Sequence, residues 1–577
     1  MEDRFPEVSD FLTTISFLDP DSIPVDIVVK GAEAISHRSP ALSSSTNITL
    51  PSFAEKLLSL ILSPLARHHA MEQLQNRSLV KYQRGANVST VHIHSLIQFM
   101  IQQRARSVGV EEKWFDVAVK LVCAAFNLQD DPASPQSWAQ YESFVPHIQS
   151  LTAGDGSRGE LALLLLRANE RVSGYFHVRR RYDEAEHLLQ RIQEWKEQRF
   201  GADDEETLAS IHELGRVYHS QRRYDEAERK FEHVLSVRQR LQADYQSTIK
   251  VAISLAGVWG AQSRYHEAEK MYLDILSSRE QHYGPDDIET STSTVDLAHV
   301  YNSQGRHAEA MGLYNRVLAK WEPQLGVDHP LIRSVMNGLA GIHYLQEQLD
   351  EAQRLYEAVL ASQEKQLGLD HPETLSIMKD LAAVYLSQGL FEKAVPMYEH
   401  ILMHWERQFG SQHPDTLKDA ASLAAVIDSQ GWFDEAEALY EQISASWERQ
   451  VGPEHPETIR TKNSLAGVYH SQGRHQQAAA LYEQVLAIRD KFLGSDHPDT
   501  FATTNNLAAA YHAQGRYDES VAMYRHLLEK EEKTLGADHP LTLATLSHVA
   551  IVYRAQGMHE AAEEMERRAA GTKERDQ

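Results

Sequence analysis

Several features that many proteins depend on are scarce in this 577-residue chain. Its single cysteine, Cys123, cannot form an intramolecular disulfide, and it rules out a metal site with paired thiol ligands. The 57 Lys and Arg are outnumbered by 82 Asp and Glu, giving a formal charge of −25 that disfavours general nucleic-acid binding. No apolar run is long enough to cross a bilayer, and the acidic, polar start is unlike a signal peptide. These absences predict a soluble protein of the cytoplasm.

The chain also lacks the motifs of common enzymes. No GxxxxGK[ST] string occurs, nor any Gly-Lys pair, so a backbone cradle with a lysine for nucleotide phosphates is not expected. No serine stands in a GxSxG context, and His212-Glu213 is not followed by the second histidine of HExxH. Neither a cofactor nor an enzymatic activity is therefore predicted.

What the sequence does contain is an internal repeat. The string GPEHPET begins at Gly452 and its counterpart GSDHPDT begins 42 residues later, at Gly494, with further copies at the same spacing. Weaker copies begin at Gly201 and Gln242. Self-similarity at a fixed period is typical of repeat architectures, and we expect about ten units between residues 158 and 570.

Each unit is predicted to form two antiparallel helices. Apolar or small residues at i, i+1 and i+4, such as Leu465, Ala466 and Tyr469, have helical spacing. A His-Pro pair precedes the first helix, where the missing N–H of proline costs nothing. A Gln-Gly pair predicts a left-handed turn between the two helices. The turn glycine is replaced in three units, by Arg222, Ser263 and Glu347.

This pattern resembles the tetratricopeptide repeat in its 42-residue form, as found in kinesin light chains. The resemblance covers residues 158–570 and implies an all-α fold, a right-handed superhelical solenoid of about ten helix pairs, with a polar tail at 571–577. It also implies that the first helices line a concave groove that receives a partner.

Residues 1–150 carry no repeat marker. The strings FLTTISFLDPDSIPVDIV from Phe11 and VHIHSLIQFMIQ from Val91 predict short helices with a small strand pair. In their order, these strings look like the winged-helix region and helical connector of fungal NB-ARC–tetratricopeptide proteins, which are related to NOD-like receptors. Without a phosphate-binding loop, the resemblance does not carry ATPase activity to this chain. The segment is more acidic than basic, so DNA binding by a winged helix is not expected either.

The many histidines could suggest a metal site, but their spacing argues against one. Six histidines occur one per inter-repeat turn, too far apart to share a zinc ion: His329, His371, His413, His455, His497 and His539. A hydrogen bond to a neighbouring backbone group explains them better. His92 and His94 have strand-like spacing, but no carboxylate pattern accompanies them. Cys123, in an apolar helical stretch, is expected to be buried and inert.

The predicted partner site is the groove lined by the first helices. Its candidates flank the Leu-Ala core pair, lie one turn beyond it, or stand near the helix start. They are Asp296, His299, Asn302, Asn337, Tyr344, Lys379, Asp380, Lys418, Arg460, Asn463, His470, Asn505, Asn506 and His512, followed by His548 and Arg554 in the last repeat. Asparagine offers donors and acceptors that can hold an extended peptide backbone, although the same residues are also compatible with a merely solvated face.

The leading prediction is a non-catalytic scaffold that binds a protein or peptide partner, and an acidic solenoid favours a basic one. The repeats are not expected to bind the C-terminal carboxylate of a chaperone, because Ala383 stands where an asparagine partner of Lys379 would be needed. An alternative is the regulatory half of a nucleotide-dependent switch whose ATPase is on another chain. A kinesin-light-chain-like cargo adaptor is weaker, since residues 1–150 show no sustained heptad. No nucleic-acid, membrane or metal partner is predicted.

Overall fold

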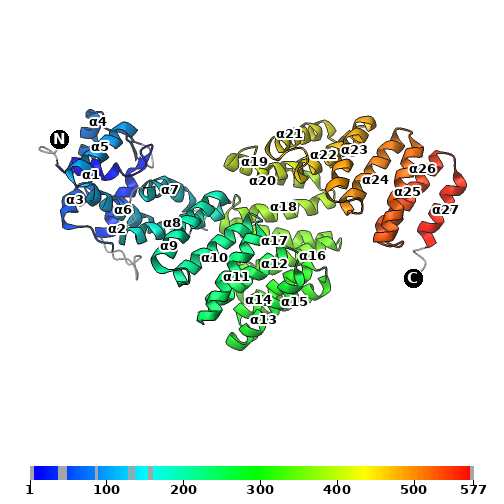
Figure 1. Ribbon diagram of the computed structural model, residues 1–577, viewed down its shortest axis with the longest axis horizontal. Helices are drawn as coiled ribbons and strands as arrows, with labels where there is room; N and C mark the ends of the chain where they lie inside the picture. The colour runs from blue at the N-terminus through cyan, green and yellow to red at the C-terminus, as the bar shows by residue number, and fades with distance from the viewer. Residues whose placement is uncertain are drawn as a thin grey trace. The chain divides into compact units, whose positions relative to one another are not determined.

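A computed structural model of the chain describes residues 6–36, 48–84, 89–127, 132, 137–153, 160–242 and 244–571. Nearly all of the described residues are helical, from α1 (Pro6–Ile15) to α27 (His559–Gly571) (Figure 1). Of the predicted polar tail, residues 572–577 lie outside the described residues. No described helix is both long and apolar enough to cross a membrane.

The N-terminal module combines short helices with a small antiparallel sheet. Its elements after α1 are β1 (Ile23–Pro24), α2 (Val25–Ser36), α3 (Glu55–Leu62), α4 (Pro64–Asn76), β2 (Lys81–Arg84) and β3 (Ser89–His92). Strand β3 lies between the other two, so that Val91 pairs with Ile23 on one side and with Tyr82 on the other. The resemblance of this module to a winged helix stays a prediction. The sequence predicted a strand pair, and the short third strand β1 was not expected.

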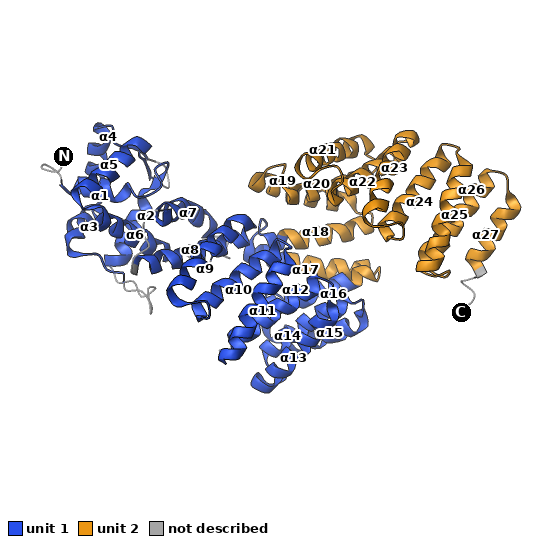
Figure 2. Cartoon of the chain, in the orientation of Figure 1, with its two compact units in different colours: residues 1–342, 361–374 blue, residues 343–360, 375–577 orange. Residues whose placement is uncertain are grey.

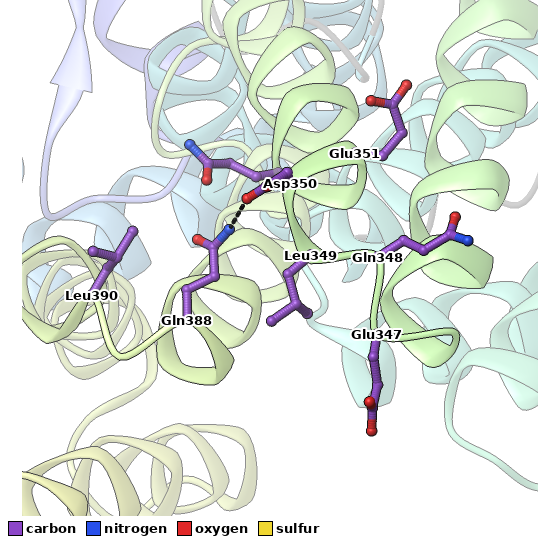
Figure 3. A pocket seen from close by; sticks show the side chains of 8 residues that line it. Glu347, Gln348, Leu349, Asp350, Glu351, Gln388 and Leu390 are labelled. Carbon is purple, nitrogen blue, oxygen red and sulfur yellow. Dashed lines mark hydrogen bonds between the residues drawn. The ribbon is translucent and has the colours of Figure 1, made fainter.

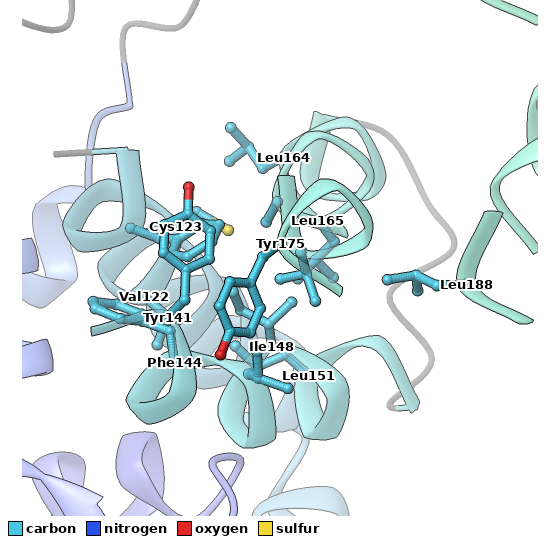
Figure 4. Close-up of a cluster of buried hydrophobic side chains, with 14 of the residues drawn as sticks. Val122, Cys123, Tyr141, Phe144, Ile148, Leu151, Leu164, Leu165, Tyr175 and Leu188 are labelled. Atoms are coloured by element: carbon cyan, nitrogen blue, oxygen red, sulfur yellow. The ribbon is translucent and has the colours of Figure 1, made fainter. Parts of the chain in front are cut away.

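Three further helices connect this module to the repeats: α5 (Ser95–Val108), α6 (Glu111–Asn127) and α7 (Trp138–Ala153). Helix α6 packs so closely on α2 that a Cβ at Gly31 would lie 2.0 Å from the carbonyl oxygen of Leu121. Cys123 is buried on α6 among side chains of α7 and of the first repeat (Figure 4), and burial raises the pKa of its thiol to about 12. This confirms the prediction of a buried, inert cysteine.

The remaining helices form ten consecutive pairs, numbered here as repeats 1 to 10. The pairs of repeats 1 to 5 are α8 (Glu160–Val178) with α9 (Tyr182–Phe200), α10 (Glu205–Ser220) with α11 (Tyr224–Leu241), α12 (Tyr245–Ala261) with α13 (Tyr265–Tyr283), α14 (Ile288–Ser303) with α15 (His307–Leu325), and α16 (Pro330–Leu345) with α17 (Leu349–Leu367). Those of repeats 6 to 10 are α18 (Pro372–Ser387) with α19 (Phe391–Phe409), α20 (Pro414–Ser429) with α21 (Phe433–Val451), α22 (Pro456–Ser471) with α23 (His475–Phe492), α24 (Pro498–Ala513) with α25 (Tyr517–Thr534), and α26 (Pro540–Ala555) with α27. The all-α solenoid of about ten helix pairs is thus confirmed.

The ends of the helices explain the repeated sequence markers. The Nδ1 atom of each His-Pro histidine accepts a hydrogen bond from the backbone N–H two residues on, as His413 does from Asp415 at 3.2 Å. This side chain satisfies one of the backbone donors that every helix start leaves open, which confirms the structural interpretation of these histidines. The turn between the helices is left-handed, with φ of 77° at Gly473. Arg222, Ser263 and Glu347 adopt the same region, with φ of 62°, 62° and 60°.

The chain divides into two compact units (Figure 2). Unit 1 comprises residues 1–342 and 361–374, and unit 2 comprises residues 343–360 and 375–577. Within unit 1, a single apolar core runs from Val8 in the N-terminal module to Val300 in repeat 4. The repeats of unit 2 are held by smaller successive clusters, such as the one around Tyr440 and Trp447. The division at residues 150–158 follows the sequence pattern alone and stays a prediction.

Candidate functional site

The fourteen predicted groove residues that precede the last repeat lie on first helices, in repeats 4 to 9. Helix α14 carries Asp296, His299 and Asn302; α16 carries Asn337 and Tyr344; α18 carries Lys379 and Asp380; α20 carries Lys418; α22 carries Arg460, Asn463 and His470; and α24 carries Asn505, Asn506 and His512. Asp380 and Arg460 are exposed, and the others are half-buried. The residues up to 337 belong to unit 1 and the rest to unit 2, so the two sets are described separately.

In unit 1, some of these side chains hold the repeats together. His299 contacts Ser334 of the next first helix at 3.2 Å through Nε2, and Tyr314 of its own repeat at 2.6 Å through Nδ1. Burial lowers the pKa of His299, which is therefore neutral at pH 7. Asn302 contacts the ring of His307 at 2.9 Å. His299 and Asn302 are accordingly occupied by structural contacts, whereas the Oδ1 atom of Asn337 is buried without a hydrogen-bond partner.

Two carboxyl groups of the predicted set, those of Asp296 and Asp380, are partly desolvated by the protein around them. Burial raises the pKa of Asp296 to about 6, against the opposing effect of Arg279. In unit 2, burial likewise raises the pKa of Asp380 to about 6, although solvent still reaches its side chain and Lys379 acts in the opposite direction. A carboxyl group in such surroundings is stabilised by a cation brought close to it.

In unit 2, polar side chains meet between neighbouring first helices. Lys379 on α18 forms an ion pair with Asp419 on α20. Asn463 on α22 accepts a hydrogen bond from Thr503 on α24 at 3.4 Å. Farther along, Asn505 on α24 contacts His548 on α26 at 3.0 Å and Tyr344 on α16 contacts Ser387 on α18 at 3.2 Å, so the row extends along the unit.

The other predicted residues of unit 2 either contact residues of their own repeat or have a polar atom without a hydrogen-bond partner. Arg460 pairs with Glu457 in its own helix, and Lys418 approaches Asp415 at 3.8 Å. The Nδ1 atom of His470 is buried without a hydrogen-bond partner, and burial lowers the pKa of this histidine. The ring of His512 packs beside that of Tyr517, with centroids 5.6 Å apart.

A second set of residues, which the sequence analysis did not single out, joins successive repeats at the turn between the two helices. In repeat 4, the Arg306 guanidinium lies 3.9 Å from the ring centroid of Tyr301 and 3.0 Å from Oε1 of Glu269 in the preceding second helix. It also donates to Oε1 of Gln304 at 2.9 Å. Repeats 2, 3 and 8 repeat the arrangement around Arg223, Arg264 and Arg474. We call this arginine, aromatic ring, turn glutamine and glutamate an arginine rung.

The signal for the rungs was present in the sequence, because these arginines directly follow the turn glycine or its substitute. The same position is occupied by Gln348, Leu390 and Trp432 in repeats 5, 6 and 7. At two of these turns, the Oε1 atoms of Gln388 and Gln430 are buried without a hydrogen-bond partner. The rung is therefore interrupted in three consecutive repeats.

Two pockets of unit 2 lie at the interrupted turns. The larger, of about 800 Å³, is lined by Glu347, Gln348, Leu349, Asp350, Glu351, Gln353, Gln388 and Leu390. Gln388 donates to Asp350 at 3.2 Å across this pocket, and Figure 3 shows Leu390 on the other side of Gln388. The second pocket, of about 520 Å³, lies beside Trp432 and includes Asp434 and Glu435 together with Gln472 and Arg474 of the complete rung in repeat 8.

Among the described residues, no three His, Cys, Asp or Glu side chains are grouped in a way that could hold a metal ion. The histidines weighed as ligands have other surroundings. His94 caps helix α5, where its Nδ1 accepts from the N–H of Leu96 at 3.2 Å, and His92 ends strand β3. His212 contacts Ser254 on the next first helix at 3.0 Å.

Comparison with known proteins adds a family match. The model of the tetratricopeptide repeat matches residues 164–240, 247–322, 331–403, 419–491 and 492–575. A solved structure of "putative kinesin light chain nearly identical TPR-like repeats" from Podosopora anserina is 32% identical, covers 36% of this chain and 98% of its own, and has a TM-score of 0.33. BtubC (BKLC) from P. vanneervenii is 22% identical, with coverages of 40% and 91% and a TM-score of 0.33. A Rap protein complexed with Competence and Sporulation Factor is 14% identical, with coverages of 64% and 97% and a TM-score of 0.43. Among curated proteins, none matches.

Proposed function

Because the chain belongs to the tetratricopeptide-repeat family, we propose that it is an interaction scaffold whose first helices hold an extended segment of a partner protein. The binding region that we assign lies in unit 2, on α18 to α24. This region contains nine of the predicted groove residues, and Tyr344 lies at its edge, at the end of α16.

The proposal rests on one observation, the row of half-buried polar side chains between neighbouring first helices. The opposite face of these helices is closed by buried residues such as Leu465 and Leu507, so the polar row is the side open to a ligand. Asn463 uses its carbonyl oxygen toward Thr503 and keeps both amide protons for a partner. Asn506 adds a complete amide group next to Asn505 on the same helix. Such groups match the alternating donors and acceptors of an extended backbone.

Charge adds a preference for a basic segment. Solvent reaches the side chain of Asp380, but partial burial still raises the pKa of its carboxyl group to about 6. A cation of the partner held near this carboxyl group would stabilise its charged form. The chain as a whole carries a formal charge of −25, which attracts basic partners over a longer range and speeds their association at low salt.

The test uses the full chain and peptides selected from a random display library. Simultaneous substitution of Asn463, Asn505 and Asn506 by alanine removes three amide groups that can bond the peptide backbone. We expect Kd for the selected peptides to rise about 10- to 100-fold, since each lost hydrogen bond contributes about 0.5–1.5 kcal/mol. Fluorescence anisotropy with labelled peptides measures the change.

The matched control replaces Gln442, Gln484 and His526 by alanine. These exposed residues lie on second helices and share the 42-residue spacing of the repeats. Their substitution should leave Kd unchanged, while both variants keep the helical circular dichroism of the parent. Peptides that bind the parent, the groove variant and the control variant equally well would contradict the assignment of this surface.

A further inference from the structure

A narrower site within unit 2 follows from the tyrosines of the second helices. Repeats 3 to 9 all carry a buried tyrosine at the same position, from Tyr272 to Tyr524. In repeat 4, the hydroxyl of Tyr314 contacts Nδ1 of His299 at 2.6 Å on the first helix of its own repeat. A Cβ at Gly338, on the next first helix, would lie 2.7 Å from the same hydroxyl. The tyrosine hydroxyl therefore lies between two neighbouring first helices.

Repeats 5 and 6 keep this tyrosine but lack its partner. The position of His299 is taken by Gly341 in repeat 5 and by Ala383 in repeat 6. The side chains of Tyr356 and Tyr398 are only 6% and 4% exposed, yet within the described part of the chain neither hydroxyl takes part in a hydrogen bond. A buried hydroxyl without a partner is costly, so these two groups are suited to a ligand that bonds them.

A carboxyl group stands beside these hydroxyls. Asp380 on α18 occupies the position that Gly338 has in repeat 5, where the tyrosine of the preceding second helix borders it. By the same spacing, the hydroxyl of Tyr356 on α17 approaches Asp380. Burial is the main cause that raises the pKa of Tyr356 and Tyr398, and the negative charge of Asp380 raises both further. Three oxygen-bearing groups from α17, α18 and α19 thus gather around one place in unit 2.

No cation of the described residues is paired with Asp380. Its neighbour Lys379 forms an ion pair with Asp419 on α20 instead. Asp380 itself is exposed, and among the described residues its carboxylate has neither a hydrogen bond nor an ion pair. The carboxylate and the two hydroxyls are therefore open to a cation that comes from outside the chain.

The corresponding carboxyl group of repeat 4 has different surroundings. Asp296 also lies near two such tyrosines, and its charge raises the pKa of both after the larger effect of burial. There, however, both hydroxyls are used, since Tyr272 donates to the carbonyl oxygen of Ile253 at 3.5 Å and Tyr314 contacts His299. Of the two places, the one in repeat 6 keeps the carboxylate and both hydroxyls available together.

We propose that Asp380, Tyr356 and Tyr398 bind the side-chain ammonium group of a lysine in the partner. The lysine belongs to the segment held by the first helices of unit 2, so this assignment rests on the function proposed above. An ammonium group has three N–H donors, which match one carboxylate and two hydroxyl oxygens. Arginine is less suited, because its planar guanidinium fits acceptors that lie in one plane, and these acceptors come from three helices.

The tests use the full chain and the peptides selected from the random display library, with Kd from fluorescence anisotropy. The selected peptides should share a lysine. Its replacement by norleucine, which keeps the length and loses the ammonium group, should raise Kd by about tenfold or more. The variants D380N and Y356F/Y398F should raise Kd for the lysine peptide by a similar factor. Y356F/Y398F should also keep or raise the thermal stability of the parent, because it removes only two buried hydroxyls that have no partner.

The control variant E399Q removes one negative charge at an exposed residue next to Tyr398, and its Kd should equal that of the parent. The norleucine peptide should bind D380N and the parent equally, because the contact is already lost. Selected peptides without a lysine would overturn the proposal. Lysine peptides that bind the parent, D380N and Y356F/Y398F equally would do the same, as would equal binding of a peptide with arginine in place of the lysine.

The groove variant with alanine at Asn463, Asn505 and Asn506 separates this site from the groove. Peptides that bind the groove variant weakly but bind D380N normally would contradict the lysine site and leave the groove in place. Peptides whose Kd depends on lysine and on Asp380 but not on the three asparagines would support the lysine site and contradict the groove assignment.

Discussion

Repeats 2 to 4 and repeats 5 to 7 share the same helix pattern but are joined by different chemistry. The earlier repeats have complete arginine rungs, and buried cations such as Arg238 and Arg279 donate to backbone carbonyls of the next first helix at 2.7 and 2.6 Å. Repeats 6 and 7 place Trp405 and Trp447 at the position of these cations, as repeat 4 does with Trp321, whereas repeat 5 has Gln363 there. Trp405 and Trp447 stack beside an aromatic residue or a histidine. The difference teaches that the small-residue and aromatic core defines the repeat, while the contacts at its edges can be polar or apolar.

The largest expected loss of stability comes from removing the arginine of one rung. Arg306→Met removes the ion pairs with Glu269 and Glu309 and the donor to Oε1 of Gln304, while it keeps an apolar contact with Tyr301. Glu269 then has only the hydrogen bond from Gln304. We expect a loss of about 1–2 kcal/mol in the free energy of unfolding, because partly buried acceptors lose a charged partner that solvent screens in part. Urea denaturation of the full chain, with hydrogen exchange of α14 and α15, measures the loss. Leu390→Met should change little, and an equal loss in both variants would mean that the rungs do not distinguish the two regions.

Acid should weaken the repeats with rungs more than those without. Hydrogen bonds from Gln304 and Arg306 lower the pKa of Glu269 below its usual 4.5, against an opposing effect of burial. A carboxyl group with a lowered folded-state pKa stabilises the fold above its unfolded pKa, and this contribution disappears as the pH falls through the folded value. The stability gap between the parent and Glu269→Gln should therefore shrink as the pH falls from 6 to 3.5. Urea titrations at several pH values test this, and a constant gap would argue against a charged rung.

The smallest expected effect concerns the turn of repeat 5. Glu347 has a φ of 60°, a region that costs a residue with a Cβ about 1–2 kcal/mol. Glu347→Gly relieves this cost but makes the unfolded chain more flexible, so we expect a net gain of about 0.5–1 kcal/mol. The urea midpoint should rise, and Gly389→Ala at the corresponding turn of repeat 6, with a φ of 73°, should lower it. A fall in the midpoint for Glu347→Gly would show that its side chain has a stabilising role at the interrupted turn.

The sequence predicted the regular features of the fold well. The 42-residue spacing, the His-Pro and Gln-Gly markers and the buried Cys123 all depend on local backbone geometry or on hydrophobic pattern, and both can be read from a single chain. The rungs were missed because each joins residues about 37 positions apart, such as Glu269 and Arg306, and no local rule relates them. Only the recurrence of arginine after the turn could have indicated them.

The groove was predicted less completely. The positions of the candidates on first helices followed from the period, but their pairing depends on the register between neighbouring repeats. Lys379 finds Asp419 forty residues on, and His299 finds both Ser334 and Tyr314, so these side chains are partly occupied by the fold itself. The sequence could not separate such residues from Asn463 and Asn506, which keep groups for a ligand.

The burial of the chain's only thiol has a practical consequence for measuring how the repeats move. With a pKa of about 12 and almost no exposure, Cys123 is almost entirely protonated at neutral pH and unreactive toward maleimide dyes. Cysteines introduced at exposed positions of two different repeats would then be labelled selectively, with the native residue left in place. Single-molecule energy transfer between such dyes could follow the stretching of the repeat array in solution as a partner binds.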